Sequence, residues 1–190
     1  MTVMPEEIFD VVNEQDEVVD TKPRSEVHRM GLLHRAVHAL VYNSKGEVFL
    51  QKRSMIKDSH PGRWDSSASG HVDTGENYDQ TVIREIAEEL GLKIESVPEK
   101  LFKIDARAET DQEFVWVYRL QHEGPFTLHP EEIESGEWME PAFVSKWISI
   151  QPERFAPAFN YIWEKIAALK AVNQDGMVPE AGFEPATKGL

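Results

Sequence analysis

The chain predicts an α+β fold, in which a mixed β-sheet is flanked by helices, with a hairpin at the N-terminal end and a helix near the C-terminal end. Short apolar, β-prone runs bounded by turn residues are typical of strands. Residues 78–90 and 154–172 instead carry apolar side chains at helical spacing. Because strands and helices are interspersed along the chain, without internal repeats, we expect one layered domain.

The first strands are expected to form two hairpins. We expect the first from residues 8–12 and 17–20, and the second from residues 34–42 and 47–51. The second hairpin has a clear turn signal in Asn43-Ser-Lys-Gly46. Between the hairpins, residues 22–31 are polar and rich in turn formers, and residues 53–69 predict a long loop after the second hairpin.

The second half of the chain is expected to hold more strands and two further helices. Strands are expected at residues 101–107, 113–120 and 136–139, a short helix at 141–147 and a terminal amphipathic helix at 154–172. Residues 173–190 are rich in Gly and Pro and predict a disordered tail. A single domain is therefore expected over residues 1–172.

Composition excludes several classes of function. With 34 acidic and 20 basic residues, the net charge of −14 argues against a nucleic-acid polymer as partner. The absence of cysteine removes disulfides, thiolate metal ligands and thiol nucleophiles. No apolar run is long enough to span a membrane, and the first residues are acidic where a secretory signal would be basic. We therefore expect a cytoplasmic protein whose partners are small molecules, without a nucleic-acid polymer or a membrane as partner.

The segment Gly70–Leu92 carries the most specific pattern in the chain. On the predicted helix 78–90, Glu85, Glu88 and Glu89 share one face, beside an apolar flank. Carboxylates at these offsets repel one another, and a hard divalent cation offsets that repulsion. Such an ion also suits phosphoanhydride chemistry. Outside this face, Glu76 and Arg84 are expected to form an ion pair that supports the loop before the helix.

The whole pattern resembles the Nudix box, G-x5-E-x7-R-E-U-x-E-E-x-G-U with U aliphatic, and the resemblance to Nudix hydrolases covers residues 32–150. It implies a Nudix-type sandwich and hydrolysis of a diphosphate, with water as the nucleophile. By the same resemblance, Mg²⁺ (or Mn²⁺) is held by Glu85, Glu88, Glu89 and the backbone of Gly70. A late acidic loop resembles the one that supplies a further ligand or base, which would be Glu132. The base is then Glu132 or a glutamate of the box.

Two segments, residues 22–38 and 57–71, look like those of isopentenyl-diphosphate isomerase-like Nudix proteins. This narrower resemblance implies a second metal site, and its ligands would be His28, His34, His71, Asp111 and Glu113. In true isomerases a catalytic cysteine precedes the Gly-His pair, and here that position is Ser69. A serine hydroxyl is far less acidic than a thiol, so the hydrolase is favoured over the isomerase.

The substrate is expected to be a nucleoside diphosphate derivative or a prenyl diphosphate. Arg53 is a candidate for binding its phosphates, and Trp64 is a candidate for stacking on a base or lining an apolar pocket. Two alternatives to the hydrolase stay open, an isopentenyl-diphosphate isomerase and a non-catalytic module that binds a nucleotide diphosphate. The N-terminal hairpin and the terminal helix offer surfaces for a homodimer.

Overall fold

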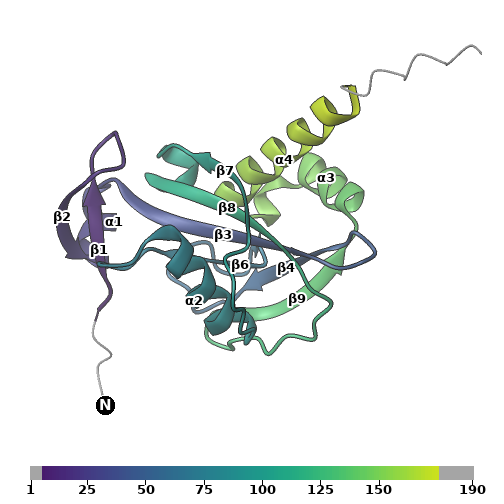
Figure 1. Ribbon diagram of the computed structural model, residues 1–190, viewed down its shortest axis with the longest axis horizontal. Helices are drawn as coiled ribbons and strands as arrows, with labels where there is room; N and C mark the ends of the chain where they lie inside the picture. The colour runs from purple at the N-terminus through teal and green to yellow at the C-terminus, as the bar shows by residue number, and fades with distance from the viewer. Residues whose placement is uncertain (1–5, 176–190) are drawn as a thin grey trace, which may run out of the picture.

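The computed structural model of the protein describes residues 6–175. The expected N-terminal hairpin is a separate two-stranded sheet of β1 (Ile8–Val12) and β2 (Val18–Pro23), at one end of the molecule (Figure 1). The polar segment that follows was expected to be turn-rich, and this expectation was wrong. It forms α1 (Arg24–Met30), which buries only Val27 and ends at Gly31 in a left-handed conformation. With one buried apolar residue, so short a helix has no periodicity to detect.

The main sheet is mixed and seven-stranded. Its strands are β3 (His34–Tyr42), β4 (Val48–Arg53), β5 (Trp64–Asp65), β6 (Ala68–His71), β7 (Glu99–Ile104), β8 (Glu113–Gln121) and β9 (Ile133–Met139). The central pair, β3 and β8, is parallel, and the other pairs are antiparallel. β3 changes partner along its length, because it pairs with β6 from Ala36 to Ala39 and with β4 only at Val41 and Tyr42.

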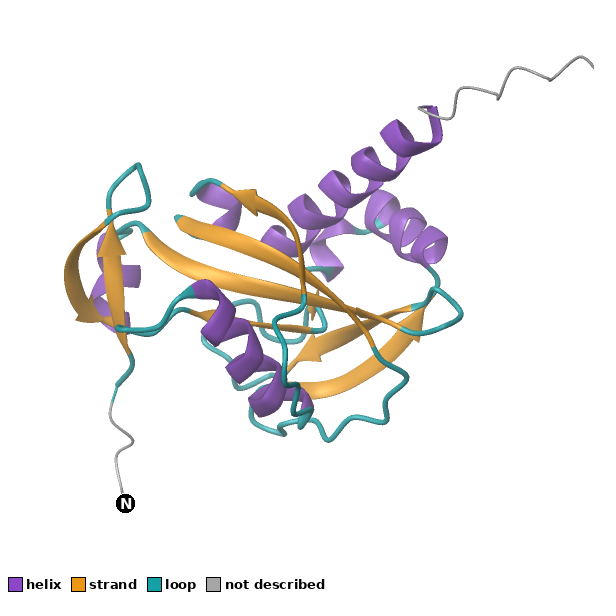
Figure 2. Ribbon diagram, in the orientation of Figure 1, coloured by secondary structure: helices purple, strands orange, loops and turns teal. Residues whose placement is uncertain are grey.

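Helices cover both faces of this sheet, which confirms the expected sandwich (Figure 2). On one face, α2 (Tyr78–Leu90) buries Val82, Ile86 and Leu90. On the other face lie α3 (Pro141–Ile150) and α4 (Pro157–Asp175), with the short 3-10 turns η1 (Ala108–Thr110) and η2 (Pro152–Arg154). α4 buries the expected apolar face up to Ile166, whereas Leu169 is 48% exposed.

The bounds of α2 were predicted correctly because local signals fix both of its ends. Asn77 caps the first turn in a reciprocal pair with Gln80, and Gly91 ends the helix with φ 64°. The long loop at residues 53–69 was predicted less well, since it contains β5 and the start of β6. Both strands are too short, at two and four residues, to show alternation.

At the C-terminal end, α4 runs past the predicted limit of the domain. Residues 173–175 of the expected disordered tail belong to α4, and the rest of that tail lies outside the described residues. Within residues 6–175, no helix combines the length and the apolar character that crossing a membrane requires.

Candidate active site

A cleft of about 990 Å³ opens beside the N-terminal half of β3. Residues from α1, β3, β6 and α2 line it, together with the loop between β4 and β5, the segment after η1 and the first residues of α4. These elements are far apart in sequence, and β3 and β6 bring them together at the centre of the sheet. The cleft contains most of the residues singled out in the sequence.

The three carboxylates of α2 differ in exposure. Glu85 and Glu89, one turn apart, are 8% and 5% exposed, whereas the side chain of Glu88 is 58% exposed. Gly70 on β6 lies directly against Glu85, because a Cβ atom at this glycine would be 2.0 Å from Oε1 of the carboxylate. Only glycine allows the strand so close. The fold therefore places the Gly70 backbone beside two buried carboxylates.

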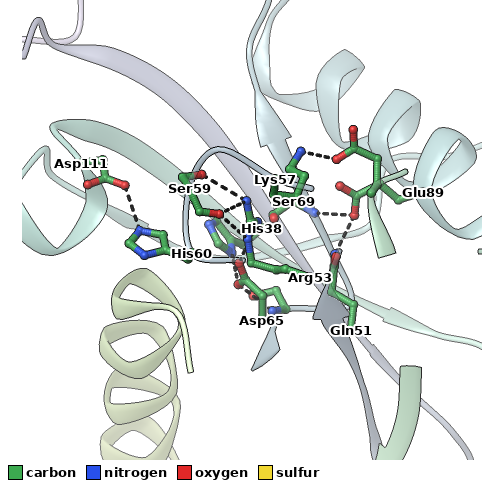
Figure 3. A network of polar contacts seen from close by, with 12 residues as sticks. His38, Gln51, Arg53, Lys57, Ser59, His60, Asp65, Ser69, Glu89 and Asp111 are labelled. Carbon is green, nitrogen blue, oxygen red and sulfur yellow. Dashed lines mark hydrogen bonds and ion pairs between the residues drawn. The ribbon is translucent and has the colours of Figure 1, made fainter. Parts of the chain in front are cut away.

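Glu89 is held by two hydrogen bonds to one oxygen. The side-chain amide of Gln51 donates to Oε2 over 2.6 Å, and the backbone N–H of Ser69 donates to the same atom over 3.3 Å (Figure 3). Burial nevertheless raises the pKa of Glu89 to about 8, and the negative charge of Glu132 adds to this. The carboxylate therefore lacks a positive partner of its own.

Glu85 is in a similar state. Burial raises its pKa well above the ordinary value, and the negative charges of Glu89 and Glu88 raise it further. Arg84 lowers it in part, since Nη1 of the guanidinium lies 2.7 Å from Oε1 of Glu85. One guanidinium therefore faces a group of three carboxylates, and the group has room for additional positive charge.

Arg84 also contacts Glu76, as the sequence suggested. Its Nε and Nη2 donate to the two oxygens of Glu76 over 2.9 and 3.0 Å, which is the two-pronged geometry that lysine cannot form. Nη2 donates further to the backbone carbonyl of His71 over 3.0 Å. Arg84 thus joins the loop, β6 and α2, and the position of Glu85 depends on it.

Glu132 also lines the cleft, where its carboxylate contacts the ammonium of Lys57, and its charge acts on Glu89 of α2. Arg53 also lines the cleft, but its guanidinium donates to the backbone carbonyl of Ser59 over 3.0 Å and to Asp65 over 3.3 Å. Arg53 therefore holds the loop between β4 and β5 in place.

The histidines named from the sequence form a second cluster. Ligand atoms of four residues lie within 4.8 Å of one another, and the four are His28, His34, His71 and Glu113. Nε2 of His71 is 2.9 Å from Oε1 of Glu113, and Nε2 of His34 is 3.4 Å from it. Burial and the neighbouring histidines lower the pKa of His28 to about 4, so this ring is neutral at pH 7. Although burial opposes ionisation of Glu113, the contacts with the His34 and His71 rings hold its pKa well below the ordinary range.

Comparison with known proteins decides the family. Residues 32–159 match the family model described as the NUDIX domain. The chain belongs to the Nudix family. It is 37% identical over 139 residues to an uncharacterized Nudix hydrolase of Yersinia pestis, covering 71% of this chain and 74% of that protein. A crystal structure of a protein from Deinococcus radiodurans is 32% identical, with a TM-score of 0.68, covering 76% of this chain and 90% of that one.

The isomerase-like branch is also supported. An isopentenyl-diphosphate Delta-isomerase of Serratia proteamaculans is 28% identical over 166 residues, covering 86% of this chain and 93% of that protein. Membership of the Nudix family supports an enzyme with pyrophosphohydrolase activity in general. Nudix proteins also generally use divalent metals.

Two residues named from the sequence have other surroundings than expected. Asp111 lines the cleft but is not part of the histidine cluster, because it ends η1 with φ 52° and its Oδ2 lies 3.4 Å from Nε2 of His60. β8 begins only at Glu113, so Asp111 lies outside the strand that positions Glu113. Trp64 does not line the cleft, since it is 9% exposed and packs in the core against Trp147, with ring centroids 5.9 Å apart.

The structure adds two residues of the site that sequence reasoning missed. Gln51, 1% exposed, holds Glu89, and His38, 5% exposed, lines the cleft. For His38 the signal was present, because it interrupts an apolar β-strand with a polar side chain that needs a buried partner. The identity of that partner depends on the strand pairing and could not be obtained from the sequence.

Proposed function

We propose that the protein is a divalent-metal-dependent hydrolase that cleaves the diphosphate linkage of a nucleoside diphosphate derivative or a prenyl diphosphate. The observation that carries the proposal is the group formed by Glu85, Glu88, Glu89 and the Gly70 backbone at the wall of the cleft. Two of these carboxylates, Glu85 and Glu89, are buried and have raised pKa values. Because burial of a carboxylate without a cation is costly, their position supports a role in binding a cation.

The donor set fits Mg²⁺ or Mn²⁺. All of the donors are oxygens, which hard divalent ions prefer, and the neighbouring guanidinium of Arg84 is already divided among several acceptors. Bound there, the ion would screen the charge of a diphosphate and lower the pKa of an attacking water. The raised pKa values also fit, since a buried carboxylate that awaits a cation resists ionisation without it.

The protein groups then have separate tasks. Glu85, Glu88 and Glu89 supply ligand oxygens, and Arg84 fixes the rotamer of Glu85. Glu132, which also lines the cleft, is a candidate to accept the proton of the attacking water at its carboxylate. A glutamate of α2 is the other candidate. In the free protein the ammonium of Lys57 contacts the carboxylate of Glu132. Glu132 can therefore accept a proton from water only after this ammonium has moved to another anion.

The test is phosphate release from a panel of diphosphates with Mg²⁺ or Mn²⁺, in the wild-type chain and in Glu89→Gln and Glu132→Gln. We expect Glu89→Gln to reduce release by about 100-fold or more with the fold intact. If Glu132 is the base, Glu132→Gln loses activity but retains metal affinity, whereas Glu89→Gln loses both. Near-full activity of Glu89→Gln would overturn the assignment of the metal site.

Isomerase activity is the second candidate, and Ser69, which stands where true isomerases have the catalytic cysteine, argues against it. Its backbone N–H donates to Glu89, and no thiol is present anywhere in the chain. Incubation with isopentenyl diphosphate and analysis for the dimethylallyl isomer tests this directly. A third candidate, a binding module without catalysis, predicts that a nucleoside diphosphate derivative binds while no divalent ion elicits phosphate release.

We further propose that His28, His34, His71 and Glu113 hold a second metal ion. Neutral imidazoles with one carboxylate suit Zn²⁺ or Mn²⁺, and the four ligand atoms already lie within 4.8 Å of one another. Nε2 of His34 is buried without a hydrogen-bond partner among residues 6–175. An unsatisfied ligand nitrogen inside such a cluster supports a site for a cation.

A further inference from the structure

The floor of the cleft carries a buried histidine that belongs to neither metal cluster. His38 on β3 is 5% exposed and lines the cleft together with Ala36 of the same strand. Its partner across the antiparallel pair is Ser69 on β6, so both side chains stand on the same face of the sheet. His38 therefore lies next to the strand that brings Gly70 to the carboxylates.

A chain of polar contacts fixes the His38 ring. Nδ1 lies 2.9 Å from the Ser66 hydroxyl and 3.7 Å from Oδ1 of Asp65. Asp65 in turn accepts a hydrogen bond from Arg53 over 3.3 Å, and these residues form one connected group in Figure 3. With Nδ1 engaged on this side, Nε2 on the other edge of the ring is the nitrogen left for the cleft. Among the residues that the structure describes, none hydrogen-bonds to it.

The ring is suited to bind a neutral polar group. Burial lowers the pKa of His38, so the imidazole is uncharged at neutral pH. A neutral ring whose Nδ1 is already engaged keeps one hydrogen-bonding position at Nε2. A hydroxyl group, which can both donate and accept, matches either tautomer.

The cleft lining has few large apolar side chains. Across residues 6–175, the lining contains no Phe, Tyr or Trp, and Ile56 is its one large aliphatic residue. The lining also includes four small side chains, those of Ala36, Ala108, Ala156 and Ala158. A prenyl chain would therefore meet few large apolar side chains, and a base would find no aromatic ring of Phe, Tyr or Trp on which to stack.

We propose that His38 is a specificity-determining residue, whose Nε2 hydrogen-bonds a hydroxyl of the group attached to the diphosphate, so that a sugar-like group is selected over a prenyl chain. This inference rests on the proposed hydrolase function, because it requires the diphosphate to lie at the carboxylates of α2. His38 then contacts the part of the substrate that extends along β3, away from that diphosphate.

Two substitutions separate the two edges of the ring. In His38→Asn the shorter amide can still reach Ser66 but withdraws from the cleft, whereas His38→Gln places its amide near the former Nε2. Binding is measured by calorimetry in the full chain with Mg²⁺, in a Glu132→Gln background that keeps the carboxylates of α2, and the ligands are checked afterwards for cleavage. The ligands are uridine diphosphate glucose, isopentenyl diphosphate and inorganic pyrophosphate, and thermal melts check folding.

We expect the parent to bind uridine diphosphate glucose more tightly than isopentenyl diphosphate. His38→Asn should weaken binding of the sugar nucleotide about tenfold, the effect of one lost hydrogen bond, and His38→Gln should recover most of it. Pyrophosphate, which lacks such a group, should bind the parent and both variants with affinities within about twofold of one another.

Equal binding of the sugar nucleotide by His38→Asn and the parent, or a preference of the parent for isopentenyl diphosphate, would overturn the inference. If His38→Asn does not fold, two results still test the inference. They are the ligand preference of the parent and the affinity of His38→Gln for uridine diphosphate glucose. Failure of the hydrolase proposal is distinct, since it would appear as no phosphate release by the wild-type chain.

Discussion

A Cβ atom on Gly70 would lie 2.0 Å from Oε1 of Glu85. That carboxylate is buried, and Arg84 holds the same oxygen over 2.7 Å, so it has little freedom to move aside. Gly70→Ala should therefore displace Glu85 by about an ångström, and displacements of this size cost about 100-fold in rate. We expect phosphate release and divalent-ion affinity to fall together, as measured by steady-state assays and metal titration.

Gly46→Ala is the matched control for this substitution. Gly46 has φ 80° in the turn between β3 and β4, and a Cβ atom there meets nothing within 4 Å. We expect it to lower the melting temperature through backbone strain while activity is kept. If Gly70→Ala were as active as Gly46→Ala, the close contact with Glu85 would have no catalytic importance.

Gln51 should set the pH range of activity through Glu89. Its amide donates to the Glu89 carboxylate over 2.6 Å, and this hydrogen bond lowers a pKa that burial raises. Gln51→Met keeps the side-chain volume but removes the donor, so the pKa of Glu89 should rise further. We expect the acid limb of the pH–rate profile to move to higher pH by about one unit, the effect of one hydrogen bond to a charged group. An unchanged acid limb would show that ionisation of Glu89 does not limit the rate.

The metal-free protein should lose stability as the pH rises from about 6.5 to 8. In this range the unfolded chain holds Glu89 ionised, whereas the folded chain, with a pKa of about 8, still binds a proton there. Glu85 acts in the same direction, since its pKa is also raised. Below pH 6.5 the lowered pKa values of His28 and His38 oppose this trend, so the higher range isolates the carboxylates.

Melting temperatures in the presence of EDTA measure this effect. We expect Glu89→Gln to flatten the decline and to be more stable than the wild type at pH 8, because an uncharged amide replaces a buried carboxylate. Added Mg²⁺ should stabilise the wild type more at pH 8 than at pH 6.5, since metal and protons compete for the same oxygens. A variant that is less stable than the wild type at pH 8 would contradict the raised pKa of Glu89.

The sequence predicted best those parts of the site whose role depends on neighbouring positions in the chain. α2, its end at Gly91 and the order of its carboxylates follow from local signals in one element, and the sequence predicted them correctly. The contact of Glu76 with Arg84 spans only a loop and two turns of helix, and it was also expected. These features need no knowledge of how distant segments pack.

Residues whose role depends on tertiary packing were predicted less well. Trp64 has the chemistry of a ligand-binding aromatic, but β5 pairs with the end of β4 and directs it into the core behind α3. Gln51 became a partner of Glu89 because β4 passes beneath the end of α2, which no local pattern reveals. Asp111 was included through the resemblance to isomerase-like proteins, but the positive φ angles of Asp111 and Gln112 form a turn that separates it from the cluster at Glu113.

The separation of Asp111 from Glu113 allows a paired test of the second metal site. Glu113 lies between His34 and His71 in the cluster, whereas Asp111 contacts His60 outside it. Titration with Co²⁺, followed by its visible absorption, should show an imidazole-containing site in the wild type and in Asp111→Asn. Glu113→Gln should lose this signal or weaken the affinity for Co²⁺ by about tenfold or more, since charged oxygen ligands dominate binding of a divalent ion.

The variant Glu89→Gln, at the other proposed metal site, should retain the signal, because the two sites share no ligand. Equal affinity in Glu113→Gln and the wild type, with folding confirmed by circular dichroism, would leave the cluster as a hydrogen-bonded group without a metal.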